Sequence, residues 1–276
     1  MSGFQHVMSS KPVVALVKVG ATIFLAITLL AAGFAACLIP QATETMANAY
    51  VDTDYSALSH DDLVRGAIAT RDYSFFGHDK HELLATIYEM NQDYVSSGKA
   101  YAKSKVAPDI DLDVDAHALS TEALEAALYP ADESYVLTED AITHLDDVYN
   151  VAAIAYPVLV IVALLCIAAF AHVVFYRGWR GVSLPFIIGG GILLVLFAIL
   201  GGWALADFYT MFNALHSLLF SNGSWLFSYD SLLICMLPQD FWVGLGAIWL
   251  GVTVALSILC VVIGIVLRKR CVEVKE

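Results

Sequence analysis

The chain has 276 residues, of which 59% are hydrophobic and only 15% charged, and its formal net charge is −13 at pH 7. This composition lies far from that of an average soluble domain and indicates a membrane protein. The acidic balance argues against a nucleic-acid partner, because nucleic-acid-binding proteins present a basic face.

Four apolar runs are each long enough to cross the hydrocarbon core of a bilayer, which takes about 20 residues of helix. They cover residues 13–39, 151–175, 182–206 and 241–267. A signal peptide is the alternative for the first run, which contains Phe34-Ala35-Ala36-Cys37, but 27 apolar residues exceed the core of about 7–15 that such peptides have. We therefore expect an all-α membrane protein with four transmembrane helices.

The distribution of Lys and Arg predicts how these spans are oriented. Residues 40–150 contain 22 acidic and only 6 basic residues, whereas the other eight basic residues lie in the N-terminal segment, in the loop after the second run or in the C-terminal tail. Basic residues favour the cytoplasmic side of the membrane. The predicted cytoplasmic segments are 1–12, 176–181 and 268–276, and the predicted extracellular segments are an acidic cap at 40–150 and an aromatic loop at 207–240.

The cap has a helical pattern. Ser59-x-x-Asp62 and Asp79-x-x-Glu82 have the form of capping boxes that begin helices reaching to about residues 76 and 95, because a side-chain oxygen at each start satisfies free backbone amides. Two shorter helices are expected near 121–129 and 139–150. The last should continue into the second span, since no Gly or Pro interrupts it before Pro157.

The sequence gives no strong indication of a metal site. The candidate ligands are the acidic, histidine and cysteine residues of the cap and the spans. Residues 109–115 alternate Asp with apolar residues and predict a solvated turn or a short edge strand; a calcium loop is a weaker alternative, because Ala116 occupies the place that needs Gly. His78 and His81 are spaced i, i+3 but lack a clear third ligand. The five cysteines show no ligand spacing and no disulfide framework. No metal or cofactor is expected.

Two histidines flank the predicted outer ends of the spans. His216 lies in the loop 207–240 among many aromatic residues; an interfacial aromatic belt would explain the rings but not the embedded His216 and Asn213. His144 precedes the second span, with Asp147 at i+3 on the same helical face. Asp147 either orients the imidazole or makes an ordinary surface contact. Both histidines are candidate acid–base catalysts, since the pKa of histidine lies near neutrality.

The motifs around these histidines resemble the DUF1461 membrane family, which includes the lipoprotein intramolecular transacylases. Glu139-x-x-x-x-His144-x-x-Asp147-Val148 carries one part of the resemblance, and Phe212-x-x-x-His216-x-x-x-Phe220 followed by Trp225 and Asp230 carries another. Asn91-x-x-Tyr94 resembles a further signature of the family. The resemblance implies two catalytic histidines, His144 and His216, with supporting roles for Asp147, Asn91, Tyr94, Phe212, Phe220, Trp225 and Asp230.

The resemblance also implies a reaction and a location. The sn-2 acyl chain of a diacylglyceryl lipoprotein moves to the amino group of its own N-terminal cysteine, so the expected partners are diacylated lipoproteins and membrane lipid of a bacterial cell membrane. One histidine would deprotonate the amine, and the other, protonated, would stabilise the oxyanion and protonate the leaving oxygen. The sequence does not assign these roles. A non-enzymatic membrane sensor or assembly factor whose acidic cap binds a partner is the alternative.

Overall fold

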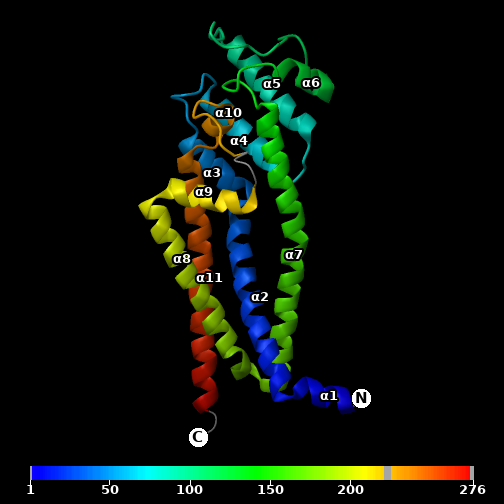
Figure 1. Ribbon diagram of the computed structural model, residues 1–276, viewed down its shortest axis with the longest axis vertical. Coiled ribbons are helices and arrows are strands. Elements are labelled where there is room, and N and C mark those ends of the chain that lie inside the picture. Colours follow the sequence, from blue (N-terminus) through cyan, green and yellow to red (C-terminus); the bar gives the residue numbers. More distant parts are fainter. Residues whose placement is uncertain (1, 221–224, 274–276) are drawn as a thin grey trace. The chain divides into compact units, whose positions relative to one another are not determined.

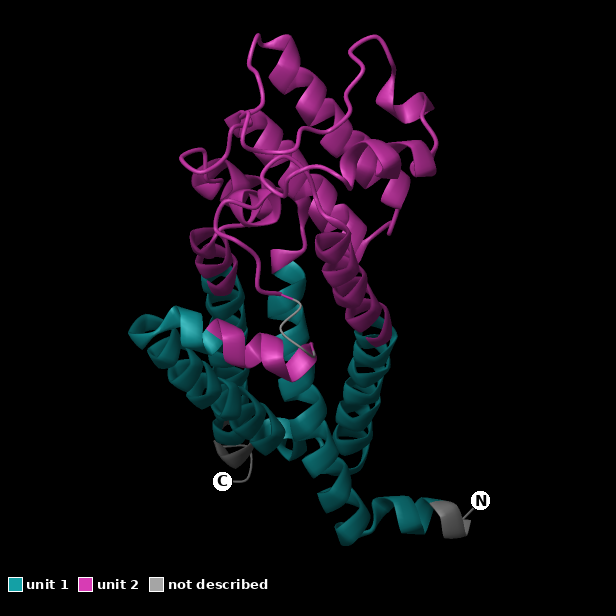
Figure 2. Cartoon of the chain, turned by 45° about the horizontal axis from the view of Figure 1, so that its top comes forward, with its two compact units in different colours: residues 1–36, 155–211, 247–276 teal, residues 37–154, 212–246 magenta. Residues whose placement is uncertain are grey.

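A computed structural model describes residues 2–220 and 225–273, and in these residues every regular element is a helix (Figure 1). The elements in chain order are α1 Ser2–Ser9, α2 Lys11–Cys37, α3 Pro40–Tyr50, α4 His60–Phe75, α5 Lys80–Ser96, η1 Ala116–Ala118, α6 Thr121–Leu128, α7 Glu139–Arg177, η2 Trp179–Val182, α8 Ser183–Ala206, α9 Phe208–Leu219, α10 Leu232–Met236 and α11 Gln239–Glu273. The chain forms two compact units (Figure 2). Unit 1 comprises residues 1–36, 155–211 and 247–276, and unit 2 comprises residues 37–154 and 212–246.

Four helical segments are long and apolar enough to cross a membrane: Lys11–Cys37, Glu139–Arg177, Trp179–Ala206 and Gln239–Lys269. Large apolar side chains on these segments are exposed, including Phe175 and Leu205, which are 79% and 92% exposed. Contiguous exposed apolar surface of this kind is costly in water and suits lipid. The helix that contains His144 runs without interruption into its apolar stretch, as its sequence predicts.

Small residues bring the helices of unit 1 close together. A Cβ atom built on Gly190 of α8 would lie 2.6 Å from the backbone oxygen of Ser257 on α11, and one on Gly189 would lie 3.2 Å from the backbone oxygen of Thr22 on α2. Gly191, the next residue, faces open space. Close backbone approach at small residues is the common way in which membrane helices associate. Gly189 and Gly190 therefore permit close helix packing, whereas Gly191 does not take part in it.

Gly190→Ala and Gly191→Ala form a matched pair that tests this packing. Gly190→Ala forces a methyl group against the Ser257 carbonyl and should destabilise unit 1 by about 1–3 kcal/mol. Gly191→Ala meets no atom within 4 Å and should be neutral or stabilising by up to about 1 kcal/mol, because Ala favours a helix. Thermal unfolding of the detergent-purified variants measures both effects, and equal unfolding temperatures would contradict the packing account.

Unit 2 is built from short helices with side-chain caps at their starts. The Ser59 hydroxyl accepts from the Asp62 amide at the start of α4, and the Asp79 carboxylate accepts from the Glu82 amide at the start of α5. The two predicted helix starts and their N-cap side chains are thus confirmed. Their helices enclose a core of buried residues that includes Leu84, Leu124, Leu137, Leu232 and Met236. Apolar burial of this kind is the main stabilising contribution to such a unit.

Three features of unit 2 and its neighbourhood differ from expectation. Residues 109–115 are turns and irregular chain, so the edge-strand alternative is wrong: Asp111 and Asp115 accept hydrogen bonds from backbone amides two residues ahead, those of Asp113 and His117. The helix α3, which begins with Pro40 at its first position, was not expected from the sequence. The segment 207–240 is not a simple loop, because it contains α9 and α10.

Candidate functional site

His144 lies near the start of α7 and points into an aromatic surround. Its side chain is buried, at 8% exposure, and its ring centroid lies 5.2 Å from that of Phe220 and 5.8 Å from that of Phe227. Its Nδ1 atom is buried and has no hydrogen-bond partner in the described part of the chain. In this conformation Nδ1 is therefore closed to solvent.

His216 lies on α9 and is held by its own helix. Its Nδ1 is 2.9 Å from the backbone oxygen of Phe212, one turn earlier, and its ring lies 3.8 Å from the Phe212 ring between centroids. A carbonyl oxygen only accepts hydrogen bonds, so Nδ1 must carry the proton. In the neutral ring the lone pair then belongs to Nε2. The helix thus selects one tautomer and leaves one nitrogen for chemistry.

One aromatic ring contacts both imidazoles. The Phe220 centroid lies 5.2 Å from that of His144 and 5.8 Å from that of His216. Trp225 lies 6.0 Å from His216 between centroids and donates its indole N–H to the Asn213 side-chain oxygen at 3.2 Å. Two histidines that are 72 residues apart in the sequence therefore share one aromatic surround within unit 2.

Burial determines the protonation state of the two imidazoles. Burial lowers the pKa of His216, because the imidazolium loses hydration, and the hydrogen bond to the Phe212 carbonyl opposes this only in part. His144 is enclosed by Phe220 and Phe227 with no hydrogen bond to Nδ1, an environment that also disfavours a charged ring. The site thus favours two neutral imidazoles.

Asp147 and Asp230 lie outside this surround. Asp147 is exposed and forms no hydrogen bond with His144 among the residues described, so the predicted orienting contact is not observed. The Asp230 carboxylate accepts from the Ser228 hydroxyl and pairs with Lys105 at 3.0 Å, and both interactions lower its pKa. Lys105 also pairs with Asp132 at 3.2 Å. Asp230 therefore ties two loops of unit 2 together.

Asn91 and Tyr94 belong to a different cluster of the same unit. The Asn91 side chain is fully buried, donates to the Tyr135 carbonyl at 2.9 Å and accepts from the Tyr101 hydroxyl at 3.1 Å. Tyr94 donates to the Ala100 carbonyl at 3.0 Å and packs against Tyr101 and Tyr135. These contacts support the fold of the loop around residues 100–102. Among the described residues, neither side chain forms a hydrogen bond with the two histidines.

Phe227 and Asn213 take part in the site although the motifs did not single them out. Phe227 packs against His144, and Asn213 holds the Trp225 indole. Both lie within the aromatic segment 207–240, so its density of rings and embedded amides is the signal that points to them. No signal in the sequence indicated that Lys105 pairs with Asp230, because the two residues are 125 positions apart.

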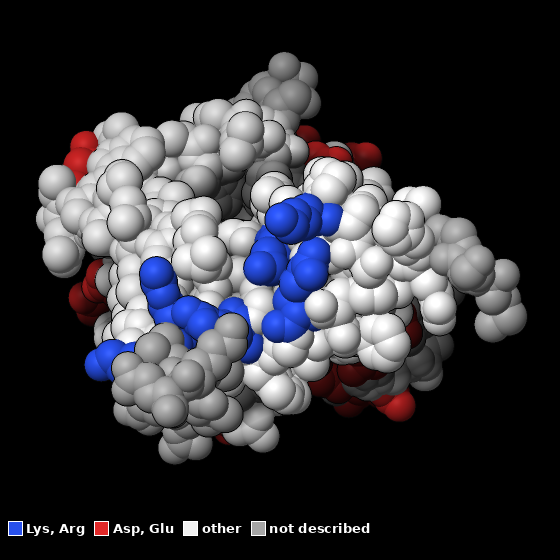
Figure 3. Space-filling view, turned by 90° about the horizontal axis from the view of Figure 1, so that it is seen from below, with Lys and Arg blue, Asp and Glu red and all other residues white. Residues whose placement is uncertain are grey.

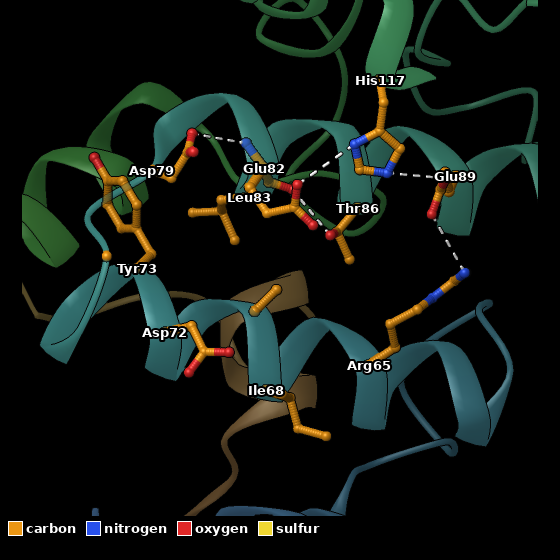
Figure 4. A pocket seen from close by; sticks show the side chains of 12 residues that line it. Arg65, Ile68, Asp72, Tyr73, Asp79, Glu82, Leu83, Thr86, Glu89 and His117 are labelled. Carbon is orange, nitrogen blue, oxygen red and sulfur yellow. Dashed lines mark hydrogen bonds and ion pairs between the residues drawn. The ribbon is translucent and has the colours of Figure 1, made fainter. Parts of the chain in front are cut away.

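A hollow of unit 2, of about 420 Å³, lies between α4 and α5 (Figure 4). Its charges are already paired: Arg65 bridges Asp62, Glu89 and Asp93, and His117 lies 3.4 Å from Glu82 and 3.3 Å from Glu89. Figure 4 shows three of these pairs, Arg65 with Glu89 and His117 with Glu89 and with Glu82, as a chain of contacts along the wall. With its charges satisfied internally, this hollow has no evident catalytic group.

The remaining histidines of unit 2 do not form a metal site. His78 stacks between Tyr73 and Tyr149, with ring centroids at 4.4 and 3.8 Å, while His81 bonds to the Leu119 carbonyl at 2.9 Å. The two side chains thus have separate partners despite their i, i+3 spacing. The described residues contain no group of three or more His, Cys, Asp or Glu that could hold a metal ion.

A model of the Lit family, described as lipoprotein intramolecular transacylase Lit, matches residues 88–242. This range is more than half of the chain and includes both histidines of the aromatic surround. The chain belongs to the Lit family. No curated protein matches it.

Solved Lit structures have the same fold. The chain is 16% identical to the membrane integral lipoprotein intramolecular transacylase Lit from Bacillus cereus, with a TM-score of 0.61 over 96% of this chain and 100% of that one. Two variants of that protein, with a histidine replaced by arginine or by alanine, give TM-scores of 0.60 and 0.59 at 14% and 15% identity. They cover 98% of this chain and 99% and 98% of theirs, respectively.

Lit membership decides between the alternatives left by the sequence. The all-α fold with four transmembrane helices is confirmed, and the chain is a multi-pass membrane protein. It is an enzyme of the lipoprotein intramolecular transacylase type. The family therefore does not support the alternative of a non-enzymatic sensor or assembly factor.

The burial of His216 predicts a pH-dependent contribution to stability. A histidine whose pKa is lower in the fold than in the unfolded chain binds fewer protons when native, so stability falls as the pH drops below about 6.5 and levels off below the folded pKa. Removing the imidazole in His216→Phe should remove this dependence. Unfolding temperatures of both proteins between pH 7.5 and 4.5 measure it. The advantage of the wild type should shrink on acidification, and a difference that is constant with pH would contradict the assignment.

Proposed function

We propose that this chain moves the sn-2 acyl chain of a diacylglyceryl lipoprotein to the amino group of the N-terminal cysteine of the same molecule. The observation that carries the proposal is the shared aromatic surround of His144 and His216 in a chain of the Lit family. In the reaction the ester C–O bond breaks and an amide C–N bond forms. One proton passes from the amine to the departing glyceryl oxygen, so no metal or cofactor is required.

His216 is the proton carrier in this proposal. Its Nδ1 donates to the Phe212 carbonyl, which leaves the Nε2 lone pair to accept a proton from the attacking amine. The same nitrogen then returns that proton to the glyceryl oxygen as the tetrahedral intermediate collapses. A lowered pKa keeps the ring neutral and ready to accept at neutral pH.

His144 is the hydrogen-bond donor to the oxyanion in this proposal. A buried Nδ1 without a partner is tolerated more easily as a bare acceptor than as an orphan donor, so the proton belongs on Nε2. That N–H would donate to the oxyanion of the tetrahedral intermediate, a contribution typically worth about 10²–10³ in rate. A neutral His144 replaces the protonated partner expected from the sequence, because burial among Phe220 and Phe227 disfavours a charged ring.

The aromatic residues supply the remaining requirements. Phe212, Phe220, Phe227 and Trp225 surround the imidazoles with apolar surface, which suits acyl chains and keeps water from competing with the amine. Ester and amine belong to one substrate molecule, so orientation alone can contribute about 7–11 kcal/mol to lowering the barrier. Asn213 fixes the Trp225 ring and thus positions one wall.

The proposed location is the outer face of a bacterial cell membrane. His144 precedes the apolar stretch that begins at Val151 by seven residues, about 10 Å of helix at 1.5 Å per residue. That distance suits an ester at headgroup depth. The Lys and Arg distribution supports cytoplasmic termini and an extracellular acidic segment at 40–150. Its partners would be diacylated lipoproteins and membrane lipid.

Substitutions with and without an N–H donor separate the two roles. His216→Asn and His216→Phe should both lower the rate by about 10²–10⁴, because neither side chain can accept a proton from the amine and return it to the leaving oxygen. His144→Phe should lose about 10²–10³, whereas His144→Asn keeps a donor and should retain about tenfold more activity than His144→Phe. Mass spectrometry of the N-terminal peptide of a diacylated reporter, expressed in a host without N-acylation, measures the acylated fraction.

His60→Ala removes an exposed histidine of α4 and serves as the control substitution. It should leave the acylated fraction of the reporter at the wild-type level. Unfolding temperatures confirm that each variant is folded. A reversed pattern, in which His216→Asn is active and His144→Asn is not, would exchange the roles. Near wild-type acylation by folded variants at both positions would overturn two-histidine catalysis altogether.

A further inference from the structure

Four basic side chains converge on one hollow of unit 1. Lys18 of α2, Arg177 at the end of α7, Arg180 of η2 and Arg268 of α11 line a cavity of about 350 Å³. Gly181, Ser183 and Leu184 complete its wall. Figure 3 shows the basic side chains gathered around this face, with no acidic side chain among them.

The charge of this hollow is not balanced by the protein. Within the described residues of unit 1, Asp207 is the only acidic residue whose side chain is described, and it caps the opposite end of α8 from the hollow. None of the four cations forms an ion pair in that part of the chain; Arg177 donates only to the Ser9 carbonyl, at 3.1 Å. The N-terminal end of α8, where the helix dipole is positive, adds to the same field. Four like charges around one cavity repel one another, and a bound anion would relieve this repulsion.

The surroundings favour an anion that carries acyl chains. Trp179 and Phe175, beside Arg180 and Arg177 in the sequence, are 63% and 79% exposed. Exposed aromatic residues next to basic ones are typical of the headgroup region of a membrane. All four cations lie on or beside helical segments that are apolar enough to span the bilayer.

We propose that the hollow formed by Lys18, Arg177, Arg180 and Arg268 binds the phosphate of an anionic phospholipid headgroup. Arginine guanidinium groups donate paired N–H groups to phosphate oxygens, and Lys18, half-buried between the helices, adds a point charge at the base. Bound in this way, a lipid joins α2, the end of α7 and α11. The site rests on charge and cavity alone and is independent of the acyl-transfer proposal.

Two double variants with equal charge change test the site. Arg180→Gln/Arg268→Gln removes two cations from the hollow, whereas Lys11→Gln/Lys269→Gln removes two exposed cations that do not line it. Short-chain phosphatidylglycerol is titrated into each detergent-purified protein, and bound lipid is counted by native mass spectrometry. Binding to the arginine double variant should be about thirtyfold weaker, while the lysine double variant should bind like the wild type.

Phosphatidylcholine and inorganic phosphate complete the experiment, with thermal unfolding as a second readout. Phosphatidylglycerol should raise the unfolding temperature of the wild type, and phosphatidylcholine at the same concentration should not. Equal phosphatidylglycerol binding by both double variants, or equal shifts with the two lipids, would overturn the site. Inorganic phosphate that reproduces the full shift at the same concentration would overturn the lipid assignment and leave a site for free phosphate.

Discussion

The burial of two imidazoles around one phenylalanine ring is the constraint on which the proposed chemistry depends. Phe220 contacts both His144 and His216. Burial lowers the pKa of His216 and disfavours a charged ring at His144, where the negative charge of Asp147 opposes this effect only in part. In the proposal, the neutral pair divides the work by tautomer and not by charge. The Phe212 carbonyl decides the tautomer of one ring, and the partnerless Nδ1 of the other favours the complementary one.

The two proposed catalytic groups lie on helices of different kinds. α7 is a long helix from Glu139 to Arg177, and His144 lies near its polar start. α9 is a short helix whose own backbone holds His216. In the proposed mechanism, a buried donor and a backbone-held acceptor are the preorganisation that favours acyl transfer.

Several parts of the fold and site follow from local sequence alone. The apolar runs, the caps at Ser59 and Asp79 and the continuity of α7 depend on neighbouring residues and were predictable. The sequence singled out His144 and His216 as candidates by their motifs and by the aromatic residues near His216, and the structure places both beside Phe220. Even the His216 tautomer is local, because its partner lies one turn away.

The parts that were not predictable depend on contacts distant in sequence. Asp230 resembles a site residue until Lys105, from a loop far earlier in the chain, is seen to neutralise it. Asn91 and Tyr94 belong to a motif, yet their partners place them in the core of unit 2. Asp147 shares a helical face with His144 but stays in solvent, since i, i+3 spacing permits a contact without requiring one. Helix α9 was hidden because aromatic residues suit a loop at an interface as well as a helix, and α10 is only five residues long.

The central claim is that the acyl chain moves within one substrate molecule, from the glyceryl ester to the cysteine amine. The most direct test is a synthetic diacylglyceryl lipopeptide whose sn-2 chain alone is deuterated, incubated with the purified enzyme in unlabelled lipid and analysed by tandem mass spectrometry. We predict that the deuterated chain appears on the amine while the glyceryl group keeps only its sn-1 chain. An unlabelled chain on the amine, taken from the sn-1 position or from membrane lipid, would contradict the account.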